Sequence, residues 1–251
     1  FSTTRAELAQ KSVDAILDFG EKGFPGILVE TIAIFINNLA APANTKVFSL
    51  THRLHLTQPQ AYIFDPELPY WIIYRNQLFD SVCRKLDFDV FEVFRDRQLT
   101  NKLLSSSGEL RVLKSRNLSD DGKAILDIPG YDSYISYAAA KPLSVFQYLD
   151  APNVYLTPNM TYKPRMMKKP PHCVVNGSLA ILIPKGGIVP TEKQLAYFSS
   201  EEYRAFYQIA RNFQTRSLNV DACSVFFYGL LRDEAKPAPE KFDTSVQLSF
   251  L

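Results

Sequence analysis

Cationic and hydrogen-bonding side chains gather near the end of this sequence, in the segment RNFQTRSLN. Arg211 and Arg216 flank Gln214 and Thr215 there, and the segment contains no acidic residue. Lysine and arginine neutralise phosphates, whereas Arg, Gln, Asn and Thr can also form hydrogen bonds with the edges of bases. The segment could therefore contact an anionic partner, or it could be an ordinary helix end that leads into a core strand.

Two further stretches of the chain are strongly basic. Residues 93–118 hold six cations and two acids, and residues 151–191 hold five cations and no acid. The second stretch contains the loop YKPRMMKK, in which prolines interrupt the run of cations. A single basic loop is usually only solvated, but three such patches in a chain of net charge +2 favour an anionic partner such as nucleic acid.

Other kinds of chemistry find little support. The three cysteines lie far apart, which predicts reduced thiols in a cytoplasmic protein. His52 and His55 could share one helix face, but no third metal ligand lies nearby. We find no Ser/His/Asp arrangement, no glycine-rich nucleotide loop and no nuclease pattern, since EVFRDR (92–97) fits the last one poorly.

The composition, 46% hydrophobic and 22% charged, is that of a globular chain that can bury a core. No apolar run reaches about 18 residues, so we expect no membrane span. The N-terminus, FSTTRAEL, lacks a starting Met and shows no signal peptide. These features suggest a part of a longer cytoplasmic protein.

The pattern along the chain predicts an α+β fold. Residues 2–11 favour a helix and 13–20 form an apolar segment. The nearly unbroken apolar run 26–37 predicts a buried strand that forms a hairpin with a return strand at 46–50. Apolar residues across 68–86 follow a roughly helical spacing, on a helix with a solvated acidic side.

The second half of the chain alternates strands and helices. A strand is expected around 109–114, between turns at SSSG and SDDG. Residues 131–148 suggest a helix that breaks before Pro142, and CVVNGSLAILIPKGG suggests two strands hinged at Asn176-Gly177. From 191 onward we expect two helices, with Ser199 or Ser200 as an N-cap.

One known family resembles this chain over most of its length. VDAILDFGEKGFPGILVETIAIFIN (13–37) resembles the late part of the catalytic domain in TaqI-like N6-adenine DNA methyltransferases of bacterial type II restriction–modification systems. ELRVLKSRNLSDDGKAI (109–125), NVYLTPNMTYKPRMMKKPPHCVVNGSLAILIPKGGIVP (153–190) and LAYFSSEEYRAFYQIARNFQTRSLNVDACSVFFYGLL (195–231) resemble the family's target recognition domain. Each motif is degenerate, and their order along the chain carries most of the resemblance.

The resemblance implies a particular fold and domain organisation. Residues 1–55 would be the C-terminal edge of a methyltransferase-like domain, contributing a short hairpin at the edge of its sheet. Residues 56–235 would be a mixed α/β target recognition domain of the kind found in type I specificity subunits. Residues 236–251 would be a tail or linker.

The resemblance also implies a function. The chain would bind double-stranded DNA in a sequence-specific way and select the site at which a catalytic half, absent here, methylates adenine N6. The cofactor-binding glycine motif and the catalytic Pro-Pro-aromatic motif of the family are both missing, and DPELPYW (65–71) does not match the latter. The chain would therefore bind no S-adenosylmethionine, the cofactor of the parent protein, and would be inactive alone.

The candidate DNA contacts combine the three basic patches. In the last patch, RNFQTRSLN would face DNA and VDACSVFFYGLL would return the chain to the core, with Gln214 and Arg216 as the best candidates for base or phosphate contact. The full set of candidates is Arg95, Arg97, Lys114, Arg116, Tyr162, Lys163, Arg165, Lys168, Lys169, Arg211, Gln214, Thr215 and Arg216.

A different class of protein remains open as the alternative. The basic loops could be merely solvated, and the chain could be a protein-interaction or structural module of a larger assembly. Such a module would not read DNA, and it would associate with another subunit through the apolar strand 26–37.

Overall fold

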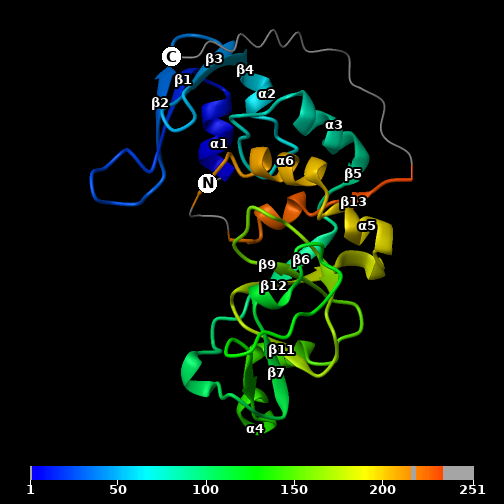
Figure 1. Ribbon diagram of the computed structural model, residues 1–251. Helices are drawn as coiled ribbons and strands as arrows, with labels where there is room; N and C mark the ends of the chain where they lie inside the picture. The colour runs from blue at the N-terminus through cyan, green and yellow to red at the C-terminus, as the bar shows by residue number, and fades with distance from the viewer. Residues whose placement is uncertain (1, 216–218, 234–251) are drawn as a thin grey trace. The chain divides into compact units, whose positions relative to one another are not determined.

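The computed structural model describes residues 2–215 and 219–233 and shows a mixed α+β protein (Figure 1). Its described residues form two compact units. The first unit contains residues 2–84 and 208–215, and the second contains residues 85–207 and 219–233. The units differ in extent from the domains expected at 1–55 and 56–235, because residues 56–84 and 208–215 lie in the first unit; the expected tail, 236–251, lies outside the described residues.

A four-stranded sheet forms the larger part of the first unit, beside helix α1 (Ser2–Ala9). Its strand order is β2-β1-β3-β4, with β1 antiparallel to β2 and parallel to β3, and with β3 antiparallel to β4. The apolar side chains that enter the core come from β1, β3 and β4, and they are Val13, Ile16, Val47 and Leu56. The strands are β1 (Ser12–Gly20), β2 (Thr31–Asn37), β3 (Asn44–Ser49) and β4 (Leu54–Pro59).

The hairpin expected between 26–37 and 46–50 is wrong. Strand β2 turns back along β1, and β3 lies on the other side of β1. The expected burial of β2 is also wrong, because its residues are half-buried or exposed. A continuous apolar run predicts cover on both faces, whereas β2 lies at the edge of this sheet and its apolar side chains stay open to solvent.

Residues 60–85 complete the first unit with α2 (Gln60–Ile63) and α3 (Gln77–Lys85). The helix expected across 68–86 is confirmed only within α3. Pro69 cannot continue a helix, and Asn76 starts α3 by accepting a hydrogen bond from the Phe79 N–H at 3.0 Å. Ile63, Ile72, Tyr74 and Phe79 are buried in this part of the core.

Three small sheets build the second unit. The first has the order β10-β9-β12-β6, the second β11-β7-β8, and the third β13-β5. Their strands are β5 (Leu86–Asp87), β6 (Phe91–Phe94), β7 (Leu110–Leu113), β8 (Ser133–Ile135), β9 (Tyr155–Pro158), β10 (Met167–Lys168), β11 (Cys173–Val175), β12 (Leu179–Pro184) and β13 (Leu230–Leu231).

Short helices connect these strands. The helix expected across 131–148 is confirmed only in α4 (Tyr137–Ala140), which ends before Pro142; residues 133–135 form strand β8 instead. The α-helices α5 (Glu192–Tyr197) and α6 (Glu201–Ala210) follow, and α6 runs from the second unit into the segment that belongs to the first. The 3₁₀ turns are η1 (Asn101–Leu103), η2 (Ser115–Asn117), η3 (Ser144–Tyr148), η4 (Lys185–Gly187) and η5 (Ser224–Phe227).

Several local predictions for the second unit are confirmed. The strand near 109–114 is β7, and the strands on either side of Asn176-Gly177 are β11 and β12. Ser200 caps α6 by accepting a hydrogen bond from the Tyr203 N–H at 3.1 Å. β11 and β12 do not pair with each other: β11 lies parallel to β7, while β12 lies between β9 and β6. No helix in the described part of the chain is long and apolar enough to cross a membrane.

Candidate nucleic-acid interface

Asn159, directly after β9, joins three segments of the second unit and is only 7% exposed. Its amide nitrogen donates to the Gly177 carbonyl at 3.1 Å and to Asn219 Oδ1 at 2.9 Å. Its amide oxygen accepts from Arg95 Nη1 at 3.3 Å and from the Val220 N–H at 3.1 Å. One buried side chain thus brings together the loop after β6, the turn after β11 and the segment that begins at 219.

Arg165 is a buried side chain that holds the loop 160–163 through hydrogen bonds to backbone carbonyls. Its guanidinium donates to the Lys163 carbonyl at 3.1 Å and to the carbonyls of Ser115 and Leu118 at 3.2 Å each. The side chain is buried, and burial lowers its pKa below the usual value of arginine. Arg165 was expected to contact DNA, but both of its Nη atoms donate to carbonyls within the protein, so its place in the structure is that of a support for the loop.

The tip loop, residues 160–163, projects between these two buried anchors. Asn159 holds one end and Arg165 the other. Between them, Met160 is 56% exposed and Tyr162 is 46% exposed. The predicted contact at Tyr162 is therefore accessible to a partner, whereas the ends of its loop are fixed.

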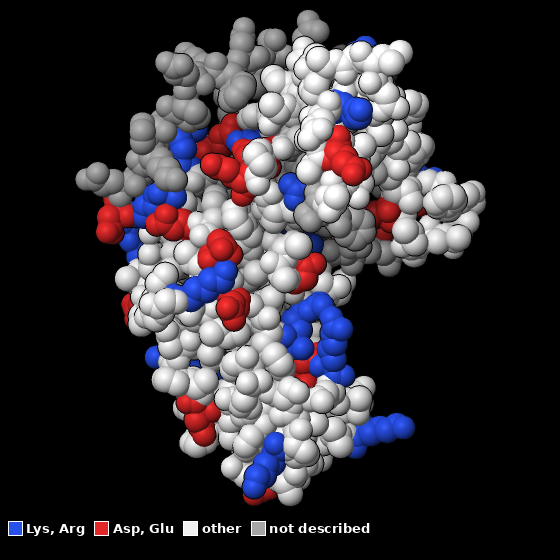
Figure 2. All heavy atoms as spheres, turned by 180° about the vertical axis from the view of Figure 1, so that it is seen from behind, with Lys and Arg blue, Asp and Glu red and all other residues white. Residues whose placement is uncertain are grey.

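Four of the predicted cations reach solvent. Lys163 Nζ lies 3.7 Å from Asp120 Oδ2, but both side chains are exposed, so this ion pair is weak and open to competition. Figure 2 shows a group of Lys and Arg side chains close together on one face of the protein. The exposed candidates are Arg97, Arg116, Lys163 and Lys168, and Arg95 is half-buried.

Lys114 and Arg116 both lie against the ring of Tyr131. Lys114 Nζ is 3.9 Å and Arg116 Cζ is 4.7 Å from the ring centroid, which is the geometry of cation–π contacts. Lys114 also donates to Ser133 Oγ at 3.0 Å and to the Tyr131 carbonyl. Burial, together with the nearby Arg116, lowers the pKa of Lys114, although Asp132 opposes this shift. Of the two, Arg116 is the one exposed to a ligand.

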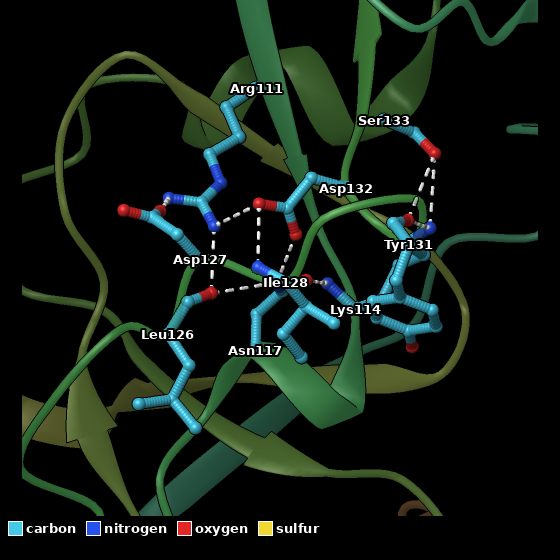
Figure 3. Close-up of polar contacts among 9 residues, drawn as sticks. All are labelled: Arg111, Lys114, Asn117, Leu126, Asp127, Ile128, Tyr131, Asp132 and Ser133. Carbon is cyan, nitrogen blue, oxygen red and sulfur yellow. Dashed lines mark hydrogen bonds and ion pairs between the residues drawn. The ribbon is translucent and has the colours of Figure 1, made fainter.

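Asp132 lies at the centre of a hydrogen-bonded network next to this region (Figure 3). Asp132 accepts from Arg111 Nη2 at 2.9 Å, from Asn117 Nδ2 at 2.7 Å and from the Ile128 N–H at 3.1 Å. Burial by itself would raise the pKa of Asp132, but these three donors outweigh it and lower the pKa. The network fixes β7, β8 and the turn η2 that carries Arg116.

Lys168 and Lys169 differ sharply although they are neighbours. Lys168 is exposed at the end of β10, whereas Lys169 is 4% exposed. Lys169 Nζ donates to the carbonyls of Leu149 at 2.8 Å and Pro170 at 3.0 Å, and burial lowers its pKa. Of the two predicted contacts, only Lys168 is available at the surface.

The predicted contacts of 211–215 belong to the first unit, whereas the cations described above belong to the second. Thr215 Oγ1 donates to Glu21 Oε1 at 2.9 Å and to Glu30 Oε1 at 3.1 Å. Arg211 is buried and lies 3.5 Å from Gln214 Oε1, and Arg216 lies outside the described residues. The acidic surroundings of Thr215 make this segment a poorer candidate for phosphate contact than the second unit.

Sequence reasoning missed the residues that organise the site. Asn159, Tyr131 and Asp132 form many of its internal contacts, yet none of them was among the candidate contacts. The available signals were weak: Asn159 follows a strand in a basic stretch, and Tyr131 lies in a tyrosine-rich one. Contacts between residues far apart in the chain leave no local pattern.

No group of His, Cys, Asp and Glu side chains within residues 2–215 and 219–233 could hold a metal ion. No protein-family model matches the chain, and no curated protein matches it.

Proposed function

We propose that the second unit binds double-stranded DNA and recognises its sequence. The observation that carries this proposal is the contact set of Asn159, through which Arg95 and the tip loop share one buried anchor with the segment at 219. Among the described residues, the exposed cations Arg97, Arg116, Lys163 and Lys168 have no acidic partner except the weak pair of Lys163 with Asp120. Fixed cations beside hydrogen-bonding side chains suit a surface where phosphates set the register and a few groups read bases.

The candidate contacts divide into two kinds. Arg97, Arg116, Lys163 and Lys168 are exposed and would contact phosphates or bases directly. Arg165 and Lys169 are buried and would act by holding the loops in place. Replacement of an exposed contact should lower the affinity for DNA alone. Replacement of a buried supporting residue should lower both the affinity for DNA and the stability of the protein.

The resemblance to adenine-specific methyltransferases suggests the setting of this DNA binding. The chain would select the target site, and a catalytic half of the same parent protein would bind S-adenosylmethionine and methylate the adenine. Extrusion of the adenine from the helix would take place in that half. The chain alone would bind DNA without methylating it.

Salt-dependent DNA binding tests the proposal. Binding of a labelled duplex is measured by anisotropy as the salt concentration rises, for the wild type and for Lys163→Met. We expect affinity to fall steeply with salt, and Lys163→Met to reduce the logarithmic salt slope by about one if the lysine contacts a phosphate.

Lys193→Met is the matched control, because Lys193 is exposed on α5 of the same unit and outside the basic loops. This variant should bind DNA as the wild type does. An undetectable affinity of the wild type at low salt would contradict the proposal, and equal losses in both variants would contradict the choice of surface.

A second candidate function has support in the first unit. Large apolar side chains are exposed along β2 and in the segments on either side of it, where a protein partner could bury them. A protein-interaction module would use this surface and would not retain DNA at moderate salt. The exposed side chains are Phe24, Ile27, Leu28, Val29, Ile32, Phe35, Ile36 and Leu39.

A further inference from the structure

The tip loop exposes apolar side chains among cations. Met160 and Tyr162 are both exposed, and Lys163 follows them directly. Arg95, which shares the Asn159 anchor, adds a second cation to the same region. A sulfur side chain and an aromatic ring at the end of a basic loop are unfavourable in water, so a partner that covers them should be both apolar inside and anionic outside.

The loop is held firmly enough to insert into such a partner. On one side, the backbone N–H of Asn159 donates a hydrogen bond to the Ser178 carbonyl at 2.9 Å. On the other side, Pro164 and Arg165 are buried. Within the loop, the Lys163 N–H donates to Thr161 Oγ1 at 2.9 Å. A loop with fixed ends loses little conformational entropy on binding.

Base pairs in duplex DNA have this combination of properties, with stacked apolar faces inside and phosphates outside. We propose that Met160 and Tyr162 act as a wedge that opens the base stack of the bound duplex. Met160 would insert between neighbouring base pairs, as flexible apolar side chains do in proteins that kink DNA. Tyr162 would stack on a base face exposed by that opening. Lys163 would contact the adjacent phosphate. This inference rests on the proposed binding of DNA by the second unit.

The test uses two short duplexes of the same sequence, one intact and one with a central abasic site. The abasic site already interrupts the base stack of the second duplex, so insertion of a side chain there requires less free energy for unstacking. A wedge should therefore bind the abasic duplex more tightly than the intact one. The wild type should bind the abasic duplex more tightly by about tenfold at about 100 mM salt. Replacement of both side chains, Met160→Ser with Tyr162→Ser, should remove the preference, so that this variant binds the two duplexes with equal affinity.

Two control variants separate the wedge from other effects. Val189→Ser removes an exposed apolar side chain elsewhere in the second unit and should keep the preference. Lys163→Met should weaken binding of both duplexes and keep their ratio. Thermal unfolding of each variant checks that the fold is intact.

The outcomes distinguish this inference from the proposed function. Equal affinities of the wild type for the two duplexes would overturn the wedge while DNA binding stands, and the exposed tip would then suit a protein partner. A preference that survives the double replacement would overturn the assignment to Met160 and Tyr162. Absence of any DNA binding by the wild type would overturn the proposed function and the wedge with it.

Discussion

At the scale of single residues, burial decides what a cation can do. Lys168 and Lys169 are identical in type and adjacent in sequence, but only Lys168 reaches solvent. A buried ammonium group must keep its hydrogen-bond partners, because an unpaired charge in the interior is costly. The sequence KK cannot show this difference, since it depends on the carbonyls that Leu149 and Pro170 present to one of the two.

We expect Lys169→Met to lower the free energy of unfolding by about 2 kcal/mol, because two buried carbonyls lose their donor. Lys168→Met is the matched control and should change it by less than about 0.5 kcal/mol, as exposed substitutions usually do. Urea unfolding measures both values. Equal stabilities of the two variants would show that Lys169 is not an internal donor.

Arg165, like Lys169, is a buried cation that donates to backbone carbonyls, and its contacts also depend on the planar shape of the guanidinium group. Its planar guanidinium serves three carbonyls at once, which one ammonium group cannot do. We expect Arg165→Lys to lower the free energy of unfolding by about 1–3 kcal/mol and also to weaken DNA binding. A variant as stable as the wild type, but weaker in DNA binding, would return Arg165 to the set of direct contacts.

At the scale of elements, the network of β7 and β8 positions Arg116. Arg111 contacts two carboxylates, Asp132 at 2.9 Å and Asp127 at 2.6 Å, whose side chains are 15% and 84% exposed. Only Asp132 also accepts from Asn117 and from the Ile128 N–H. Asp132 is therefore a half-buried carboxylate that holds several backbone and side-chain donors, whereas Asp127 forms a surface ion pair with Arg111.

Asp132 should make stability depend on pH. Its folded-state pKa lies below the usual 3.8, so its contribution is complete above that pH and is lost as the pH falls through the lower folded value. We expect Asp132→Ala to destabilise the protein at pH 7, with the deficit narrowing as the solution becomes more acidic than the usual pKa. Asp127→Ala should change the stability little both at pH 7 and at a pH below 3.8. Urea unfolding of Asp132→Ala and the wild type at these two pH values tests the prediction. A loss of stability in Asp132→Ala that is equal at both pH values would contradict it.

The β2 edge shows how far apolar patterns can predict packing. The run 26–37 contains a strand, as predicted, but burial needs a neighbour that a local pattern does not specify. Strand β2 pairs with β1 on one side only, which leaves an apolar edge open.

We expect this edge to cause association of the protein as its concentration rises, and Phe35→Lys to reduce it. The unfolding free energy should change by less than about 0.5 kcal/mol, because Phe35 is exposed. Val189→Lys, at an exposed apolar position in the second unit, should leave association unchanged. Sedimentation measures the effect, and equal association of Phe35→Lys and the wild type would exclude β2 as the contact.

At the scale of the whole molecule, two separate segments of the described chain, residues 2–84 and 208–215, form the first unit. Residues 208–215 return to it after the second unit is mostly complete. Asn212 is central to this return, because its Oδ1 accepts from the Ile73 N–H at 2.9 Å and its Nδ2 donates to the Trp71 carbonyl at 2.8 Å. Sequence analysis placed the domain boundary near 55 because it followed a resemblance in linear order, whereas these two hydrogen bonds join residues that are 139 and 141 positions apart in the chain.

Asn212 also has a positive φ of 48°, which asparagine tolerates better than most residues. We expect Asn212→Ala to lower the free energy of unfolding by about 2–3 kcal/mol, through the lost hydrogen bonds and the strained backbone. Asn212→Gly loses the same hydrogen bonds without the strain, so it should be less destabilising by about 1 kcal/mol. Calorimetry or urea unfolding can rank the two; the reverse order would contradict the assigned conformation.

The central claim is that the second unit reads DNA sequence, and selection from a randomised pool of duplexes tests it most directly. The protein is incubated with the pool at about 100 mM salt, where binding through phosphates alone weakens, and the retained DNA is sequenced. We predict enrichment of one short motif by the wild type and by Lys193→Met, with weaker recovery for Lys163→Met. Retention of DNA without an enriched motif would contradict sequence reading by this chain, and no retention would contradict DNA binding altogether.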